Sequence, residues 1–387
     1  MAQQTKHSMV KEKIKEWITS GVVKPGDKIY SENELVKMFN VSRHTVRLAV
    51  GDLVHEGWLH REQGAGTFCS NRLIESKVQN KKTAANSKNI GVITTYISDY
   101  IFPFIIRGLE SYLADQGYSL TLAATNNDIE KEKQCLQNML SRNIDGLIVE
   151  PTKSSNFNPN VNYYLELEQK NIPYLMINQY YPQLHPPYII VNDEQGGFIA
   201  TDHLIKLGHE KIVGIFKTDD LQGVYRMQGF IRSFRENNIP FFPEMILTYS
   251  TEDKEGLQEK VKNFLLASKN KPSGIICYND QLALLVLNVL RDLKIRVPED
   301  ISIVGYDDSY LAEASEVKLT SIKHPKIDMG IAAAKWIIAA IENRNEEDAH
   351  PKSIVYEPEL VIRNSTSSLK IAEPNAKHSI ENKQVPR

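Results

Sequence analysis

The sequence predicts an α/β protein in which a small winged helix-turn-helix domain precedes a larger, two-lobed domain built on doubly wound parallel sheets. Two observations carry this prediction. The first 70 residues show helical spacing of apolar positions followed by a hairpin pattern, and the residues from Asn89 onward alternate between short apolar strands and segments long enough for a helix. With 41% apolar and 24% charged residues over 387 positions, the composition is that of a globular protein with two or three folding units.

Three helices are expected at the N-terminus. Between residues 8 and 20 apolar side chains recur at helical spacing, and Gly21 can end that helix. Residues 31–34, Ser-Glu-Asn-Glu, have the capping-box pattern ahead of a short second helix. Ser42 can cap a third helix with its own apolar face. Two short helices separated by so brief a break indicate a helix-turn-helix.

A β-hairpin wing and a linker are expected next. Residues 58–61 and 67–70 are short strand-like segments around a glycine-containing turn. Residues 71–88 lose any periodicity and gather Asn, Ser, Lys and Ala, a composition typical of exposed linkers. We therefore expect a first domain at residues 1–70 and a linker at residues 71–88.

The rest of the chain is expected to form one large domain over residues 89–365. Alternating strands and helices predict right-handed βαβ units and a largely parallel sheet, and so long a stretch favours two lobes over one. Ligands bind such folds at the carboxyl ends of the strands, in the crevice between lobes. Beyond Arg363 the chain is polar and expected to be frayed, with a tail at residues 366–387. The expected strands are residues 90–95, 120–124, 147–150, 174–177, 188–191, 212–216, 275–278 and 301–305.

Composition argues against several classes of protein. No stretch of 18 apolar residues occurs and no apolar run follows the first basic residues, so a cytoplasmic location without membrane contact is expected. Cys69, Cys135 and Cys277 are far apart and odd in number, which argues for buried small hydrophobes and against a disulfide framework or a zinc site. Neither a metal nor a cofactor is expected.

Charge is unevenly distributed along the chain. The first 88 residues carry a net charge near +6 and the remainder near −8, within a total of −2. A basic front on an acidic body suits a front that meets phosphate, although a solvated surface would explain the charge alone.

The N-terminal domain resembles the winged helix-turn-helix of the GntR family. The similarity lies in Ser31-Glu-Asn-Glu-Leu35, Val41-Ser-Arg-His-Thr-Val-Arg47, Gly57 and Gly64-Ala-Gly-Thr-Phe68, which occur in that order. The larger domain resembles the effector domain of the lactose-repressor family, itself similar to periplasmic sugar-binding proteins. The segments that carry this second similarity are Ile90-Gly-Val-Ile93, Asp145-Gly-Leu-Ile148, Leu207-Gly-His209, Arg226-Met-Gln-Gly-Phe230, Tyr278-Asn-Asp280 and Val304-Gly-Tyr-Asp-Asp308.

The pairing of these two domains resembles the L-arabinose-responsive repressors of Gram-positive bacteria. The resemblance implies a transcriptional repressor that binds operator double-stranded DNA and releases it when a small sugar, L-arabinose, binds the larger domain. A homodimer is expected, because two-fold operators are met by two-fold proteins. A regulator of the same architecture that responds to another sugar, a phosphosugar or a purine is the alternative.

The third helix is the expected recognition helix, with its first turns facing base edges in the major groove. Arg43 and Arg47 are the expected base readers, because a guanidinium can fork onto guanine O6 and N7. Hydroxyls at the helix start more often hold phosphate or cap the helix, and Gln63 in the wing could read the minor groove. The arginines could instead only solvate an exposed face. The expected DNA-binding residues are Lys6, Glu32, Ser42, Arg43, His44, Thr45, Arg47, Gln63, Gly64 and Gly66.

A sugar site needs several polar groups that converge, since each unmatched buried hydroxyl costs about 1–3 kcal/mol. The ends of the expected strands supply carboxylates, amides and an aromatic ring. In the lactose-repressor pattern, positions matching Arg226, Asn279, Asp307 and His324 touch the inducer, although His324 departs from the glutamine often found there. Each residue alone could equally be a strand-end cap. The expected effector-binding residues are Tyr96, Glu150, Arg226, Asn279, Asp280, Asp307 and His324.

Two other functional classes fit parts of the sequence. Some GntR-type heads are fused to pyridoxal-phosphate enzymes, but the chain shows no distinctive Schiff-base lysine context, nucleophile elbow, phosphate loop or paired metal ligands, so no catalytic residue is expected. A sugar-binding protein without a regulatory role would leave the helix-turn-helix unexplained.

Overall fold

The computed structural model describes residues 6–56, 58–62, 65–70, 87–267, 271–343 and 351–369. The chain divides into two compact units, Met1–Ser87 and Lys88–Arg387, called here the head and the body. Within the described ranges, no helix has the length and apolar character needed to span a membrane.

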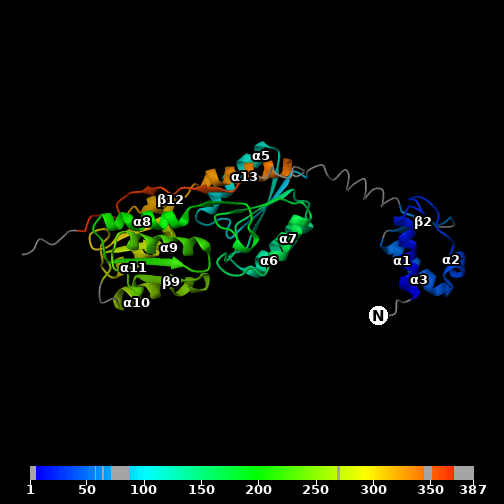
Figure 1. The fold of residues 1–387 in the computed structure, drawn as a ribbon, viewed down its shortest axis with the longest axis horizontal. Helices are drawn as coiled ribbons and strands as arrows, with labels where there is room; N and C mark the ends of the chain where they lie inside the picture. The colour runs from blue at the N-terminus through cyan, green and yellow to red at the C-terminus, as the bar shows by residue number, and fades with distance from the viewer. Residues whose placement is uncertain are drawn as a thin grey trace, which may run out of the picture. The chain divides into compact units, whose positions relative to one another are not determined.

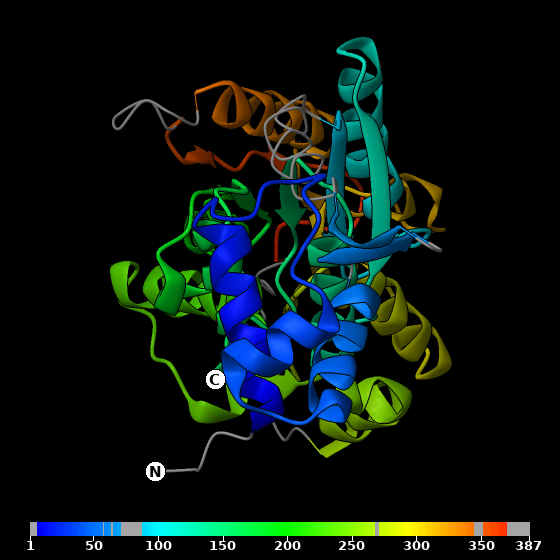
Figure 2. The same ribbon diagram turned by 90° about the vertical axis from the view of Figure 1, so that its right-hand side faces the viewer.

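Over the residues that the structure describes, the head has three helices and a two-stranded hairpin, as the sequence predicts. Its helices pack against one another, as the blue ribbons in Figure 2 show, and the apolar faces of all three meet in one core with Leu59 and Cys69 of the hairpin. The strands pair antiparallel, with Leu59 opposite Cys69. The elements are α1 Lys6–Thr19, α2 Glu32–Phe39, α3 Arg43–His55, β1 Leu59–Glu62 and β2 Gly66–Cys69.

Local capping fixes the helix-turn-helix. The backbone N–H of Ser31 donates to Glu34 Oε2 at 2.8 Å and the N–H of Glu34 donates to Ser31 Oγ at 3.4 Å, which completes the expected capping box of α2. Asn40 ends α2 in the left-handed region, and the N–H of Thr45 donates to Ser42 Oγ at 3.1 Å to begin α3. Both predicted helix starts are confirmed.

Two six-stranded sheets form the body. In the first lobe the strand order is β4-β3-β5-β6-β7-β13, and in the second it is β9-β8-β10-β11-β12-β14. The lobes thus repeat one topology, although β13 pairs parallel to β7 and β14 antiparallel to β12. The prediction of two doubly wound lobes is confirmed. The bounds are β3 Asn89–Thr94, β4 Ser119–Ala124, β5 Gly146–Val149, β6 Tyr174–Ile177, β7 Tyr188–Val191, β8 Ile212–Lys217, β9 Ile246–Tyr249, β10 Gly274–Cys277, β11 Ser302–Asp307, β12 Thr320–Lys323, β13 Ile354–Tyr356 and β14 Leu360–Val361.

Among the described residues, four helices cover the first lobe. Helices α5 Phe102–Asp115 and α13 Lys326–Glu342 lie together on one face of the sheet, and α6 Ile129–Ser141 and α7 Val161–Gln169 lie on the other (Figure 1). Glycine permits the close approach of α5 and α13, since a Cβ on Gly108 would lie 2.3 Å from the carbonyl oxygen of Ile327.

The second lobe is covered in the same way. Its sheet lies between α8 and α9 on one face and α10 and α11 on the other. The remaining short elements lie in connections of the body. The bounds are α8 Asp193–Lys206, α9 Leu221–Glu236, α10 Leu257–Ala267, α11 Asp280–Asp292 and α12 Tyr310–Ala314, with short 3-10 helices at Pro182–Leu184, Pro243–Met245 and Thr251–Gly256.

The chain crosses between the lobes three times, from β7 to α8, from β12 to α13 and from β13 to β14. The late elements α13 and β13 therefore complete the first lobe. The strands β9, β12, β13 and β14 were not among those expected, because they are short, edge-lying or rich in Thr and Ser.

The end of the chain differs from its prediction. The Oγ of fully buried Ser365 accepts the N–H of Thr320 at 2.8 Å and lies 2.6 Å from the carbonyl oxygen of Ile303. The N–H of Leu369 donates to the carbonyl of Leu207 at 2.9 Å. The prediction of fraying after Arg363 is therefore wrong for residues 364–369, while residues 370–387 lie outside the described ranges.

The cysteines behave as the sequence predicts. Cys69, Cys135 and Cys277 are all buried and free, and burial raises the pKa of each thiol. Each packs as a small hydrophobe in a core.

Candidate effector pocket and DNA-reading surface

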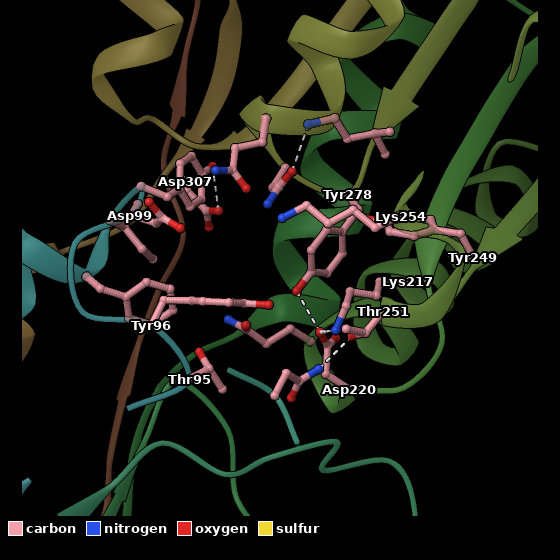
Figure 3. A pocket seen from close by; sticks show the side chains of 18 of the residues that line it. Thr95, Tyr96, Asp99, Lys217, Asp220, Tyr249, Thr251, Lys254, Tyr278 and Asp307 are labelled. Atoms are coloured by element: carbon pink, nitrogen blue, oxygen red, sulfur yellow. Dashed lines mark hydrogen bonds and ion pairs between the residues drawn. The ribbon is translucent and has the colours of Figure 1, made fainter. Parts of the chain in front are cut away.

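A cavity of about 440 Å³ lies between the two lobes of the body (Figure 3). It opens at the carboxyl ends of β3 and β5 in the first lobe and of β8 and β10 in the second, where the strand order of each sheet reverses. Doubly wound sheets bind ligands at this point because the loops there diverge and leave a crevice. Both reversal points face the same cavity, so residues of both lobes surround one ligand volume.

Four of the seven expected effector-binding residues line the cavity. Tyr96 and Glu150 come from the first lobe, and Asn279 and Asp307 from the second. In Figure 3 Tyr96 points across the pocket toward Tyr278. The structure places the other three behind the walls, all buried: Arg226, Asp280 and His324.

Glu150 is a buried part of the cavity wall that the first lobe supplies. Its Oε2 accepts the N–H of Thr95 at 2.9 Å and also the Thr95 hydroxyl, and its Oε1 accepts Nδ2 of Asn178 at 2.8 Å. Burial raises the pKa of this carboxyl to about 7, although the hydrogen bonds from Thr95 and Asn178 oppose that rise. The hydrogen bonds from Thr95 and Asn178 fix the orientation of the Glu150 side chain at the pocket.

His324 lies behind that wall, separated from Glu150 by the side chain of Asn178. Its Nε2 is 3.0 Å from Oδ1 of Asn178, whose amide nitrogen faces Glu150, so Nε2 carries the proton and donates. Burial lowers the pKa of His324 to about 3, with a further contribution from Lys326 and Arg226, so the ring is neutral. Since His324 stands on the crossing from β12 to α13, the network joins the pocket to a crossing segment.

Arg226 holds the second-lobe wall from behind. Its Nε donates to Asp193 Oδ1 at 2.8 Å and its Nη1 to the carbonyl of Tyr278 at 2.6 Å. Its Nη2 lies 3.4 Å from Asp307 Oδ1, and the guanidinium carbon is 3.5 Å from the ring centroid of Tyr306. Burial raises the pKa of Asp193 to about 6 although Arg226 lowers it. The guanidinium is satisfied inside the protein.

Asp280 is also engaged internally. Its Oδ2 accepts the N–H of Ser309 at 2.7 Å and the hydroxyl of that residue at 2.9 Å, and its Oδ1 accepts the hydroxyl of Ser321 at 2.7 Å. Burial raises its pKa to about 7, opposed by the hydrogen bond from Ser321. The carboxylate therefore joins the start of α11 to the segments that follow β11 and begin β12.

A charged cluster at the end of β8 was not predicted. Nζ of Lys217 lies 2.8 Å from Asp219 Oδ1 and 2.9 Å from Asp220 Oδ2, and the Tyr278 hydroxyl donates to Asp220 at 2.8 Å. Burial alone would lower the pKa of Lys217, but the two aspartates raise it above its ordinary value. Lys217 and Asp220 line the cavity. The strand-end rule that selected Glu150 would also have selected them.

The lobes contact each other beside the cavity. Ser155 Oγ donates to the carbonyl of Thr218 at 2.6 Å, and the N–H of Leu221 donates to Ser154 Oγ at 2.8 Å. Nδ2 of Asn127 donates to Thr251 Oγ1 at 2.6 Å. These bonds make a closed arrangement in which both walls can contact one small ligand.

The head presents a pair of arginines on α3. The side chains of Arg43 and Arg47 are 64% and 61% exposed, and both lie beside Glu32, at 3.5 Å and 3.3 Å from its Oε2. The hydrogen bond from Arg47 is the main cause of the lowered pKa of Glu32. One carboxylate on α2 thus gathers two guanidinium groups on the exposed face of the expected recognition helix.

The other expected DNA-binding residues occupy different settings. Ser42 and Thr45 are engaged in the cap of α3, with their hydroxyl oxygens 2.8 Å apart. His44 is exposed beside them, and Lys6 is exposed at the start of α1. Gly66 begins β2 with φ +132°, a value that favours glycine. The predicted wing residues Gln63 and Gly64 lie outside the described residues.

Comparison with known proteins agrees with this architecture. Residues 6–69 match the model of bacterial regulatory proteins of the gntR family, and residues 201–366 match a periplasmic binding protein-like domain. A LacI family transcriptional regulator from Enterococcus faecium, solved with bound ribose, matches with a TM-score of 0.62 at 25% identity, over 73% of this chain and 100% of that chain.

Two curated relatives match almost end to end. The arabinose metabolism transcriptional repressor of Halalkalibacterium halodurans is 53% identical over 377 residues, which are 97% of this chain and all of the relative. The repressor of the same name from Geobacillus stearothermophilus is 49% identical over 94% of this chain and 98% of its own length. The predicted pairing of head and body is confirmed. The chain is a DNA-binding transcriptional repressor rather than an enzyme, and it belongs to the family of the arabinose metabolism transcriptional repressors.

Proposed function

We propose that this repressor binds operator DNA as a homodimer and leaves it when L-arabinose binds between the lobes of the body. The observation that carries the proposal is that the strand-order reversal points of both sheets face one cavity. Carboxylate, amide and phenol groups from the two lobes converge there. A ligand that contacts both walls favours the closed arrangement over any open one, which is the requirement for an effector.

The chemistry of the cavity favours a neutral polyhydroxyl ligand. Glu150, Asp220 and Asp307 supply acceptors for sugar hydroxyls, and Asn279 supplies an amide. The rings of Tyr96, Tyr249 and Tyr278 supply flat apolar faces for carbon-bound hydrogens. The choice of L-arabinose among sugars rests on the names of the two close relatives.

The charge of the lining argues against a phosphosugar. Four carboxylates, of Asp99, Glu150, Asp220 and Asp307, face a cavity whose lysines are Lys217 and Lys254. Lys217 is already paired with Asp219 and Asp220. A phosphate placed here would meet more negative than positive charge. Titration with hypoxanthine tests whether a purine binds instead.

On the DNA side, α3 lies in the major groove with Arg43 and Arg47 directed at bases. Because both side chains are exposed, they can exchange Glu32 for guanine as their hydrogen-bonding partner. Guanine offers two acceptors in the geometry that the guanidinium group matches. Lys6 contacts phosphate, and the wing contacts the minor groove. Because one head covers one half-site, two copies of the chain bind a two-fold operator, in the cytoplasm where bacterial DNA lies.

The test combines two measurements on the full-length protein. Calorimetry compares L-arabinose, D-arabinose, D-ribose, ribose 5-phosphate and hypoxanthine as ligands. Fluorescence anisotropy then follows an operator duplex, selected by the protein from random DNA, with and without each compound. We expect L-arabinose to bind and to weaken operator binding by about 5- to 150-fold. Binding and release by hypoxanthine or ribose 5-phosphate, without any effect of L-arabinose, would overturn the choice of effector, and tighter DNA binding with sugar would overturn its sign.

A matched pair of variants links the release to the cavity. Asn279→Ala removes a lining amide that also caps α11, whereas Asn288→Ala removes a half-buried amide within that helix, away from the cavity lining. We expect only Asn279→Ala to need more sugar for release. Equal behaviour of the two variants would argue that the effector binds elsewhere.

Sedimentation at micromolar concentration tests the dimer, and a species that stays monomeric both free and on DNA would contradict it.

A further inference from the structure

Tyr100 reaches from the first lobe into the second. It lies between β3 and α5, and its ring belongs to the core of the first lobe, where only 8% of the residue is exposed. Its backbone φ of +60° is in the left-handed region, which a tyrosine adopts only when its surroundings hold it there. Burial is the main cause that raises the pKa of its hydroxyl well above the ordinary value, so the group keeps its proton and can donate it.

All three hydrogen-bonding partners of this hydroxyl belong to the second lobe. The oxygen lies 2.7 Å from Asp307 Oδ2 and 3.0 Å from the carbonyl oxygen of Tyr306, both acceptors. It accepts the N–H of Asp280 at 3.1 Å. Asp280 is the first residue of α11, and the first N–H groups of a helix have no partner within the helix. A side chain of one lobe therefore satisfies a helix start of the other.

The partner Asp307 sits in a strained turn that several groups fix. Asp307 and Asp308 have φ values of +88° and +44°, which non-glycine residues rarely adopt. Nζ of Lys326 donates to both of their carbonyl oxygens, at 2.7 Å and 2.8 Å. The carboxylate of Asp307 is held at both oxygens, with Oδ1 near Arg226 of its own lobe and Oδ2 bonded to Tyr100 of the other. Strain maintained by many contacts marks functional positions.

We propose that Tyr100 is a positioning residue that makes the orientation of Asp307 in the pocket depend on closure of the lobes. This inference rests on the proposed effector function of the pocket. When the lobes move apart, the hydroxyl must leave Asp307 and the N–H of Asp280, because it is carried by the first lobe. Closure restores both bonds and fixes the carboxylate where a ligand needs it. Tyr100 lines the cavity, but its hydroxyl is engaged by Asp307, Tyr306 and Asp280, so it contributes to effector affinity through the position of Asp307.

The test uses Tyr100→Phe in the full-length protein, because phenylalanine keeps the ring in the core and removes only the hydroxyl. Tyr174→Phe is the matched control, since Tyr174 is a buried ring of the same lobe whose hydroxyl donates to Glu168, within that lobe, at 2.9 Å. Hydrogen exchange of the Asp280 amide is measured without sugar, and L-arabinose affinity is measured by calorimetry. For Tyr100→Phe we expect faster exchange of that amide and sugar binding weaker by about 10- to 100-fold, the range for a lost hydrogen bond to a carboxylate. Tyr174→Phe should change neither.

A third variant shows whether the effect passes through Asp307. Asp307→Asn alone and combined with Tyr100→Phe should bind sugar equally weakly, because the hydroxyl has no remaining carboxylate to position. Additive losses in the double variant would overturn the proposal, as would Tyr100→Phe with unchanged sugar affinity or unchanged exchange at Asp280. If the wild type ignores L-arabinose, the proposed effector is wrong. The exchange measurement then still decides whether Tyr100 holds the start of α11.

Discussion

The head and the body each contain arginines paired with carboxylates, and the two clusters stand in opposite surroundings. In the head, Arg43 and Arg47 share Glu32 and are more than half exposed. In the body, Arg226 lies between Asp193 and Asp307 with 2% of its side chain exposed. The guanidinium groups of the head can exchange their partner for DNA, whereas that of the body has no route to a new partner.

The difference shows that residue type does not separate a reading arginine from a supporting one. Exposed ion pairs contribute about 0–1 kcal/mol, so breaking one to bind DNA costs little. A buried charge that loses its partner remains desolvated and costs about 3–5 kcal/mol. The same side chain can therefore serve the proposed recognition of DNA at the surface and support a pocket wall in the interior.

The largest effect should follow from removing the buried guanidinium. Arg226→Ala leaves the carboxylates of Asp193 and Asp307 buried without their cation, so we expect the body to lose about 3–5 kcal/mol of unfolding free energy in urea titration. Arg296→Ala is the control, since its bidentate pair with Asp300 lies at the surface. The control should lose far less stability, because water screens an exposed pair. A similar loss in both variants would remove the distinction between buried and exposed clusters.

The exposed cluster should affect binding and leave stability unchanged. Arg47→Ala or Arg43→Ala should weaken operator binding by about 1–3 kcal/mol for each lost bidentate contact, measured by fluorescence anisotropy. Lys6→Ala should weaken operator and random DNA alike and reduce the salt dependence. Should the arginine variants also lose operator and random DNA equally, these arginines contact phosphate only.

A buried carboxyl of the body, Glu150, and the carboxylate of Glu32 in the head should contribute stabilities that respond to pH with opposite signs. In the body, burial raises the folded-state pKa of Glu150 to about 7, so the folded state binds its proton more tightly and this stability is lost as pH rises through about 7. In the head, the pKa of Glu32 is lowered chiefly by Arg47, so that contribution is present above its ordinary pKa and lost as pH falls.

Melting temperatures of wild type and Glu150→Gln between pH 5 and 8 test the sign in the body. Their difference isolates this carboxyl from His324, whose lowered pKa acts in the opposite direction. The slope that Glu150→Gln removes should not exceed about 1.4 kcal/mol per pH unit. Parallel curves for the two proteins would contradict the buried, proton-binding state of Glu150.

The smallest effect should come from Glu32→Gln. The side chain loses its charge, so the arginines are no longer gathered by a carboxylate, and we expect stability to change by less than about 1 kcal/mol. Random DNA should bind more tightly, because one negative charge near the phosphates is gone. An unchanged ratio of operator to random-DNA affinity would show that Glu32 does not orient the readers.

Much of this architecture follows from local patterns in the sequence. Capping residues such as Ser31 and Ser42 act on N–H groups three residues away, and the alternation of strands and helices reflects burial that repeats every few residues. The strand-end rule found Tyr96, Glu150, Asn279 and Asp307, because the carboxyl ends of parallel strands meet at one edge.

The tertiary structure alone decided which polar residues face the cavity and which support its walls. Arg226 is matched by partners 33 and 81 positions away, and Tyr100 meets Asp307 across 207 positions. No local pattern encodes such pairs, since they exist only after the chain has crossed between lobes three times. For the same reason, local patterns could not place α13, β13 and residues 364–369, because these late segments pack against parts of the fold formed much earlier in the chain. Burial depends on what packs against a residue, and that is settled by the whole fold.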